Sequence, residues 1–310
     1  MPPKPSSKPR ADPADAVFFD TYSMLFRAFH ALPPLSTSRG EPTSGLYGFC
    51  SLFLRVMREH RPRALAFALD APARTFRAER DATYKAGRPR TPTPLAEQLE
   101  RLPALLAAFE APCFCVPGFE ADDVLATLAA RLERSGRRGL VVSGDRDLLQ
   151  LVTAQTSVLF IGARGQAPVL FDEAAVVARF GVTPAELPSY AALVGDSSDN
   201  LPGVPGVGPQ TAAKLVRAHG SVKALVAALD RITPPKLREA LGRHAERALL
   251  NEELATLRRD VPLDDGPLAA PLTASSAARL GGLFEALEFK SLVPRLEAVV
   301  ARSAGQSGAP

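Results

Sequence analysis

Residues 122–147 read DDVLATLAARLERSGRRGLVVSGDRD, and both kinds of element that the fold needs lie within this one segment. Asp122–Arg134 repeats apolar side chains at helical spacing, whereas Gly139–Ser143 is a short apolar run rich in valine. A helix followed by a short buried strand is part of a βαβ unit, which builds a parallel sheet. Asp145 and Asp147 come just past the end of the strand. The segment therefore predicts an α/β fold with acidic side chains at one sheet edge.

The same alternation recurs along the chain. Further strands are expected at Ala16–Asp20, Ala64–Asp70 and Cys113–Val116, with helices at Ser23–Ala31 and Leu95–Glu110. Residues 16–183 are thus predicted to form an α/β core with a central, mostly parallel sheet flanked by helices. Helical patterns between Pro and Gly turns dominate residues 184–299, so a helical region is expected there. Residues 1–15 and 300–310 are poor in core-forming side chains and are expected to be a disordered and a flexible tail.

Composition limits the function classes. The 310 residues carry 37 Lys and Arg against 33 Asp and Glu, a net charge of +4, and 46% are hydrophobic, as in a soluble globular protein of one or two domains. No apolar run approaches the ~20 residues that cross a bilayer, and no signal core is present. Cys50, Cys113 and Cys115 form neither a disulfide framework nor a zinc set. A cytoplasmic location without a membrane partner is therefore expected.

Seven acidic residues follow the expected strands within a few positions. Because the carboxyl ends of parallel strands share one edge of a sheet, these side chains are expected to meet there. Unpaired carboxylates would repel one another, and hard divalent cations such as Mg²⁺ or Mn²⁺ remove that penalty. Any one of them alone could equally be a loop or helix-cap residue. The seven are Asp20, Asp70, Glu120, Asp122, Asp123, Asp145 and Asp147.

A second acidic motif, GDSSDN at residues 195–200, contributes Asp196 and Asp199. Alone it could be a solvated turn, but it continues as LPGVPGVGPQTAAKLV, in which a helix is expected to start near Pro209. A glycine-rich turn before a helix N-terminus exposes N–H groups that can hold a phosphate. The pattern therefore looks like a helix–hairpin–helix that grips a DNA backbone without reading its sequence.

A basic segment lies between the second strand and the next helix. Residues 74–90 have a local net charge of +4, interleaved with Phe76 and Tyr84. Basic groups can neutralise phosphates, and an aromatic ring can stack on an unpaired base. The alternative is an exposed, solvated connection. The basic residues are Arg74, Arg77, Arg80, Lys85, Arg88 and Arg90.

Five strings in order resemble the 5′-nuclease family, which includes the N-terminal domain of bacterial DNA polymerase I, its phage relatives and flap endonucleases. They are FFDTYSMLFRAFHAL, FALDAPARTFRAERDATYKAGRPRTP, GFEADDVLATLA, VVSGDRDLLQLV and GDSSDNLPGVPGVGPQTAAKL. The resemblance covers about residues 16–295. It implies a core like that of PIN nucleases, with a helical arch at about residues 74–94 and a helix–three-turn–helix motif at residues 195–216.

The resemblance also implies roles for individual residues. The seven acids above, with Asp196 and Asp199, would bind metal, and Lys85 and Arg88 would contact the scissile phosphate as catalytic residues. Tyr84 would stack on a base. The remaining implied DNA contacts are Arg74, Arg77, Arg80, Gly203, Gly206, Gly208, Thr211 and Lys214.

The activity implied is that of a 5′→3′ exonuclease and 5′-flap endonuclease, which hydrolyses DNA phosphodiester bonds to give 5′-phosphorylated products in replication and repair. The cofactor would be two or more Mg²⁺ ions, with Mn²⁺ as a substitute and K⁺ at the helix–three-turn–helix motif. The partner would be DNA with a 5′ flap, a nick or a 5′ end. We expect a free-standing monomer, with any DNA polymerase a separate partner.

Two positions depart from the family pattern. Thr21 stands where members usually have glycine, and Gln210 stands where many have lysine, so one phosphate contact is expected to be missing. Two other functions stay open on sequence: a flap-binding protein without catalysis, and a ribonuclease with a similar acidic sheet edge. The complete acid set disfavours the first, and the helix–hairpin–helix disfavours the second. A Ser–His triad is not expected, because His30, His60, His219 and His244 all lie in helical patterns.

Overall fold

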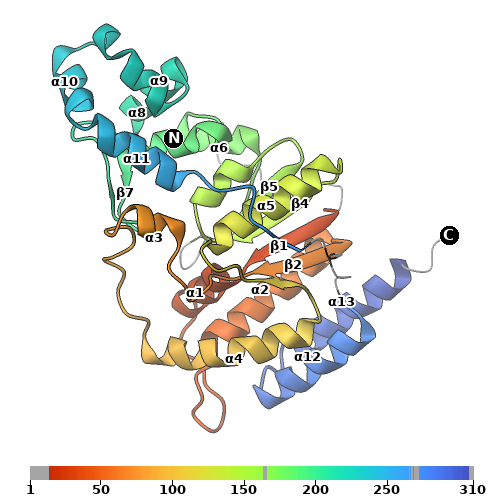
Figure 1. The fold of residues 1–310 in the computed structure, drawn as a ribbon. Coiled ribbons are helices and arrows are strands. Elements are labelled where there is room, and N and C mark those ends of the chain that lie inside the picture. The colour runs from red at the N-terminus through yellow and green to blue at the C-terminus, as the bar shows by residue number, and fades with distance from the viewer. Residues whose placement is uncertain (1–13, 163–165, 265, 267, 269–271, 307–310) are drawn as a thin grey trace.

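The structure is a computed structural model that describes residues 14–162, 166–264, 266, 268 and 272–306. A six-stranded sheet in the order β3-β2-β1-β4-β5-β6 forms its centre (Figure 1). All neighbouring strands are parallel except the β5–β6 pair. The strands are β1 (Ala16–Asp20), β2 (Ala64–Ala68), β3 (Cys113–Phe114), β4 (Gly139–Ser143), β5 (Thr156–Phe160) and β6 (Val169–Phe171). The expected fold class is confirmed.

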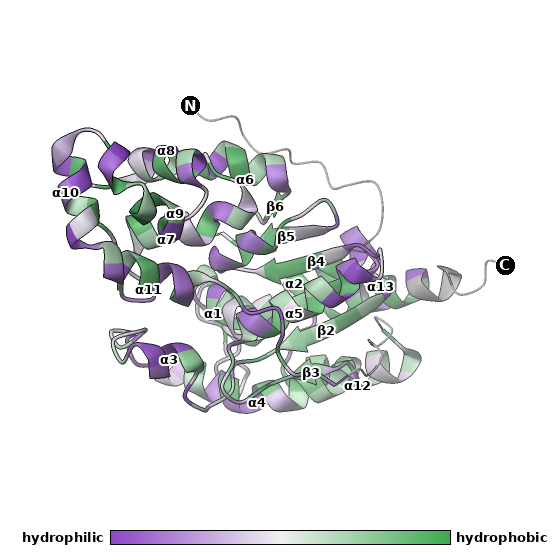
Figure 2. Ribbon diagram, turned by 45° about the horizontal axis from the view of Figure 1, so that its top comes forward, coloured by the Kyte–Doolittle hydropathy of each residue, from purple (hydrophilic) through white to green (hydrophobic). Residues whose placement is uncertain are grey.

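Helices cover both faces of this sheet. Every residue of β1 is therefore buried, although its successive side chains point to opposite faces. Val17 and Phe19 join the apolar cluster beneath α1 (Thr21–Ala31), α2 (Ser44–His60) and α4 (Thr93–Phe109). Ala16 and Phe18 belong to the opposite cluster, with α5 (Ala121–Arg134). Figure 2 shows the strands as mostly hydrophobic ribbons between these layers.

The phenylalanines beneath α2 and α4 give the first testable prediction. The Phe53 ring centroid lies 4.3 Å from that of Phe109 and 5.3 Å from that of Phe19, and its side chain is fully buried. Phe53→Ala removes this packing and leaves a cavity, so the free energy of unfolding should fall by about 3–5 kcal/mol. Urea denaturation followed by circular dichroism measures this, and a loss below about 1 kcal/mol, the cost of a mild core change, would contradict the packing.

The helical region begins after β6. It contains α6 (Glu173–Phe180), α7 (Leu187–Val194), α8 (Pro209–His219), α9 (Val222–Ala227), α10 (Pro235–Arg243) and α11 (Ala245–Ala255). A two-stranded antiparallel pair, β7 (Gly195–Asp196) and β8 (Leu201–Pro202), lies between α7 and α8. Short 3₁₀ turns cover Asp147–Leu151, Pro184–Glu186 and Leu229–Arg231. Figure 1 shows α8, α9 and α10 projecting away from the sheet.

Three sequence expectations about boundaries need correction. The last two helices, α12 (Ala274–Ala286) and α13 (Val293–Gln306), return to the core, where α12 packs on α4 and α13 on α2. They therefore do not extend the region of α6–α11. The flexible tail expected from residue 300 is helical to Gln306, and residues 307–310 and 1–13 lie outside the described part. Finally, the expected strands missed β5 and β6, which complete the sheet.

Candidate active site

Acidic side chains gather where β1, β2 and β4 end. Asp20 is the last residue of β1 and caps α1, accepting the Ser23 N–H at 3.2 Å. Asp70 follows β2, and its Oδ1 accepts the N–H of Ala121 at 2.8 Å at the start of α5. Asp145 follows β4. The three strands are neighbours in the sheet, so their carboxyl ends deliver these acids to one edge.

The electrostatics show that these carboxylates share one region. Burial, together with the charges of Asp145 and Asp70, raises the pKa of Asp20 to about 7, although a hydrogen bond from Ser143 opposes the shift. Burial, and then the charges of Asp145 and Asp20, raise the pKa of Asp122 well above its usual value. Negative groups that are buried together repel one another, and either protonation or a bound cation relieves the repulsion.

The acids of GDSSDN lie beside the same edge. Burial, followed by the charges of Asp145, Asp199 and Asp196, raises the pKa of Asp147 well above its usual value. Asp196 is held in a turn in which its Oδ1 accepts the N–H of Ser198 at 2.7 Å. The charge of Asp145 thus contributes to the raised pKa values of Asp20, Asp122 and Asp147.

Two cations of the basic segment face these acids. The Lys85 Nζ donates to Glu120 Oε2 at 2.7 Å and lies 3.8 Å from Asp199 Oδ2, and Arg88 Nη2 donates to Asp199 Oδ1 at 3.0 Å. Burial lowers the pKa of Lys85, but the charges of Glu120 and Asp199 outweigh it and the net shift is upward. The Lys85 N–H also donates to the Asp199 carbonyl at 3.0 Å, which fixes this segment over the acids.

The donor set fits divalent metal ions. Among the described residues, the carboxylates of Asp122 and Asp147 accept no hydrogen bond. Burial, and then the charges of neighbouring acids, raise the pKa values of both. Within the same ranges, no three Asp, Glu, His or Cys side chains already surround one point. Several of the acids instead turn toward protein donors, as Asp20 does to Ser143 Oγ at 2.5 Å. Oxygen ligands of this kind suit Mg²⁺ and Mn²⁺.

Asp123 and Arg77 are placed differently from the sequence expectation. Asp123 is 0% exposed and Arg77 is 1% exposed, and the two form a two-pronged ion pair with N–O distances of 2.6 and 2.8 Å. Arg77 therefore cannot contact DNA here, and Asp123 faces a guanidinium instead of the acidic edge. The physical reason is that Arg77 lies on the inner side of α3 (Phe76–Arg80).

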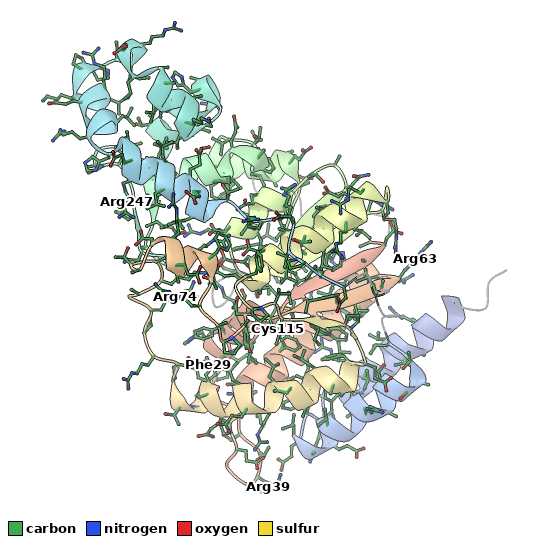
Figure 3. All side chains as sticks on the ribbon, in the orientation of Figure 1. Phe29, Arg39, Arg63, Arg74, Cys115 and Arg247 are labelled. Atoms are coloured by element: carbon green, nitrogen blue, oxygen red, sulfur yellow. The ribbon has the colours of Figure 1, made fainter. Side chains whose placement is uncertain are left out.

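Tyr84 also differs from the expectation. Its ring is buried with Leu201 and Leu254, and its hydroxyl donates to Asp199 Oδ2 at 2.8 Å, so no face is free to stack on a base. Arg74 and Arg80 are exposed, and Arg80 pairs with Glu253 of α11 at 3.1 Å. Figure 3 shows Arg74 beside α3 and Arg247 on α11, on the same side of the molecule.

The turn before α8 has the geometry that its glycines suggested. Gly206 has φ +82°, and a Cβ on Gly203 would lie 2.2 Å from the Val194 carbonyl oxygen, so a side chain fits there poorly. Gly208 is the N-cap of α8. Gly206, Gly208 and Lys214 are exposed and Thr211 is partly exposed, so this surface is open to a ligand.

Sequence reasoning missed Ser143, the last residue of β4. Its hydroxyl donates to Asp20 and accepts the Asp145 N–H at 2.9 Å, so it joins the ends of two strands. Thr21, where a glycine was expected, is the first residue of the α1 helix and is not among the described residues with positive φ. The turn therefore does not require glycine. The Thr21 Oγ1 atom is buried without a hydrogen-bond partner.

Comparison with known proteins assigns the family. Residues 15–181 match the family described as 5′-3′ exonuclease, N-terminal resolvase-like domain, and residues 182–276 match 5′-3′ exonuclease, C-terminal SAM fold. The chain belongs to the 5′-3′ exonuclease family. Members of this family are nucleases that hydrolyse DNA phosphodiester bonds, so the expected family and enzyme class are confirmed.

Curated proteins related to the chain include DNA polymerases I. The polymerase I of Mycobacterium tuberculosis is 40% identical over 301 residues, which are 96% of this chain and 33% of that protein. That of Bacillus caldotenax is 39% identical over 282 residues, 91% of this chain and 32% of that protein. The chain thus spans about a third of the length of the curated relatives it matches.

Solved structures share the exonuclease fold. The D15 protein of bacteriophage T5, co-crystallised with metal ions, superposes with a TM-score of 0.61 at 19% identity, over 92% of this chain and 98% of that one. The catalytic core of Rad2 in complex with a DNA substrate gives 0.59 at 15% identity, over 94% and 92%. Within the described ranges, none of the helices combines the length and apolar composition that spanning a bilayer requires.

Proposed function

We propose that this chain is a divalent-metal-dependent 5′→3′ exonuclease and 5′-flap endonuclease that acts on DNA in replication and repair. The observation that carries the proposal is the acidic edge where β1, β2 and β4 end, at which burial and the nearby charge of Asp145 raise the pKa values of Asp20, Asp122 and Asp147. Bound divalent cations would relieve the repulsion within such a cluster and favour its ionised form, and the family to which the chain belongs consists of nucleases.

Each group has a defined task. The metal ligands are Asp20, Asp70, Glu120, Asp122, Asp145, Asp147, Asp196 and Asp199. Bound divalent ions would lower the pKa of water and stabilise the leaving 3′ oxygen. Lys85 and Arg88 lie against Glu120 and Asp199, where they can offset the charge that develops on the phosphoryl group. The exposed turn of Gly206–Gly208 and the α8 residue Lys214 would bind the duplex backbone without reading sequence.

A cleavage assay tests this function. DNA with a labelled 5′ flap should be cut near the flap junction in Mg²⁺ or Mn²⁺, leaving a 5′-phosphate, and excess EDTA should abolish the cut. A matched RNA flap and a blunt duplex without a free 5′ single strand serve as comparison substrates. Tight flap binding without cleavage in either metal would instead favour a binding protein, and preference for RNA would favour a ribonuclease.

A further inference from the structure

The Arg77 guanidinium joins three separate segments of the chain. Its side chain leaves α3, and Nη1 and Nη2 bind the two Asp123 oxygens on α5. Nε donates to the Leu254 carbonyl at 2.7 Å, and Nη2 donates to the Thr256 carbonyl at 3.2 Å, both at the end of α11. The buried cation therefore fixes the start of α5 relative to the helical region.

Asp123 has no acceptor capacity left for a metal ion. Its Oδ1 accepts from Arg77 Nη2 and from the Arg258 N–H at 2.9 Å. Its Oδ2 accepts from Arg77 Nη1 and from the Glu120 N–H at 3.2 Å. A carboxylate offers about four lone-pair positions, and protein donors fill all of them here. Protein donors thus take up the acceptor positions of the Asp123 carboxylate.

The same pair controls the first turn of α5. Glu120 is the N-cap of α5, and its backbone N–H is held by Asp123 in a reciprocal capping box. Arg77 Nη1 also lies 3.7 Å from Glu120 Oε2. Asp122 lies between these two residues in sequence. The positions of the Glu120 and Asp122 carboxylates therefore depend on the Arg77–Asp123 contact.

We propose that Arg77 and Asp123 are a positioning pair, which aligns Glu120 and Asp122 for metal ions and couples that alignment to the end of α11. This rests on the proposed metal-dependent function. A buried ion pair is weak evidence for stability, since well-packed apolar residues often replace one without loss. What apolar residues cannot reproduce is the set of hydrogen bonds that orients Glu120, and groups that orient metal ligands matter for metal affinity.

Arg77→Lys tests the pair, because lysine keeps the positive charge but lacks the planar guanidinium that binds both Asp123 oxygens. Mn²⁺ binding to the DNA-free protein should weaken by about 10- to 100-fold, with a parallel loss of kcat in flap cleavage. Flap affinity measured in EDTA, without bound metal, should stay unchanged, since Arg77 is buried. The matched control is Arg295→Lys on α13. It removes a two-pronged contact to Ser51 of α2, which covers the face of the sheet opposite α5, and it should alter neither Mn²⁺ binding nor kcat.

A double variant, Arg77→Met with Asp123→Leu, separates positioning from folding. It replaces both charges with apolar residues, and the folded fraction should bind Mn²⁺ as weakly as Arg77→Lys does. If either folded variant binds Mn²⁺ with wild-type affinity, the pair is only structural and the proposal is wrong. Failure of the wild-type protein to cut flaps would instead contradict the proposed nuclease function, while the Mn²⁺ titrations would still decide the role of the pair.

Discussion

Asp145→Asn is expected to lower the rate of flap cleavage by about a thousandfold or more while flap binding is retained. Bound metal ions contribute several kcal/mol to the stabilisation of transition-state charge, and about 4 kcal/mol corresponds to a thousandfold change in rate. Asp145 is the residue to test because its charge adds to burial in raising the pKa values of Asp20, Asp122 and Asp147. Asparagine keeps the size of the side chain, removes the negative charge and replaces one carboxylate oxygen with an NH₂ group.

Single-turnover cleavage of a labelled flap measures this loss, and fluorescence anisotropy in Ca²⁺ measures binding. Asp230→Asn is the matched control, because Asp230 is an exposed acid of the helical region outside the acidic edge. It should cleave at the wild-type rate. Asp145→Asn protein that cleaves as fast as wild type would remove the basis for placing metal ions at this edge.

Lys85→Ala is expected to lower kcat by about 100- to 1000-fold, the usual cost of removing one donor that stabilises developing charge. It should also tighten Mn²⁺ binding in the absence of DNA, because the Lys85 Nζ lies 2.7 Å from Glu120 and competes for that carboxylate. A general loss of structure would lower kcat and also weaken Mn²⁺ binding. A lower kcat with tighter Mn²⁺ binding therefore indicates a phosphate contact.

Stopped-flow cleavage and Mn²⁺ titration of the same preparation measure the two effects of Lys85→Ala. Lys290→Ala removes an exposed lysine beside α13 and is the control, with neither quantity expected to change. If kcat for Lys85→Ala stayed within a factor of about three of wild type, a difference under 1 kcal/mol, Lys85 would have no role at the phosphate.

Local sequence signals predicted the acidic edge. Asp20 ends a fully buried five-residue strand, and Asp145 follows another, so the rule that parallel strands share a carboxyl edge was enough to bring them together. Likewise, the glycine-rich sequence predicted the turn before α8, in which Gly206 has a positive φ. In each case the residue type and its few neighbours contain the information.

The orientation of the basic segment could not be predicted in this way. Arg77 and Tyr84 look like neighbouring members of a basic and aromatic surface, yet both are buried. Their burial depends on Leu254, which follows Arg77 by 177 positions and contributes both a carbonyl and an apolar side chain. Charge and spacing within residues 74–90 cannot predict a contact with a residue so distant in the sequence.

The remaining differences also come from long-range packing. β6 is a three-residue edge strand, and its antiparallel pairing with β5, in which Val158 faces Phe171, breaks the alternation of parallel strands and helices. α12 and α13 read as a continuation of the helical region, but their apolar residues, such as Leu280 and Leu296, complete the cluster beneath α2 and α4. Helical periodicity shows that a face is apolar and leaves open which partner will cover it.

The most direct measurement for the metal-centre account is anomalous diffraction from wild-type crystals soaked in Mn²⁺. A metal centre at this site would give strong peaks at the edge where β1, β2 and β4 end, within coordination distance of Asp145 oxygens, with Asp123 still bound to Arg77 and outside that distance. Peaks that are absent from this edge in crystals of active protein, or that lie elsewhere on the molecule, would contradict it.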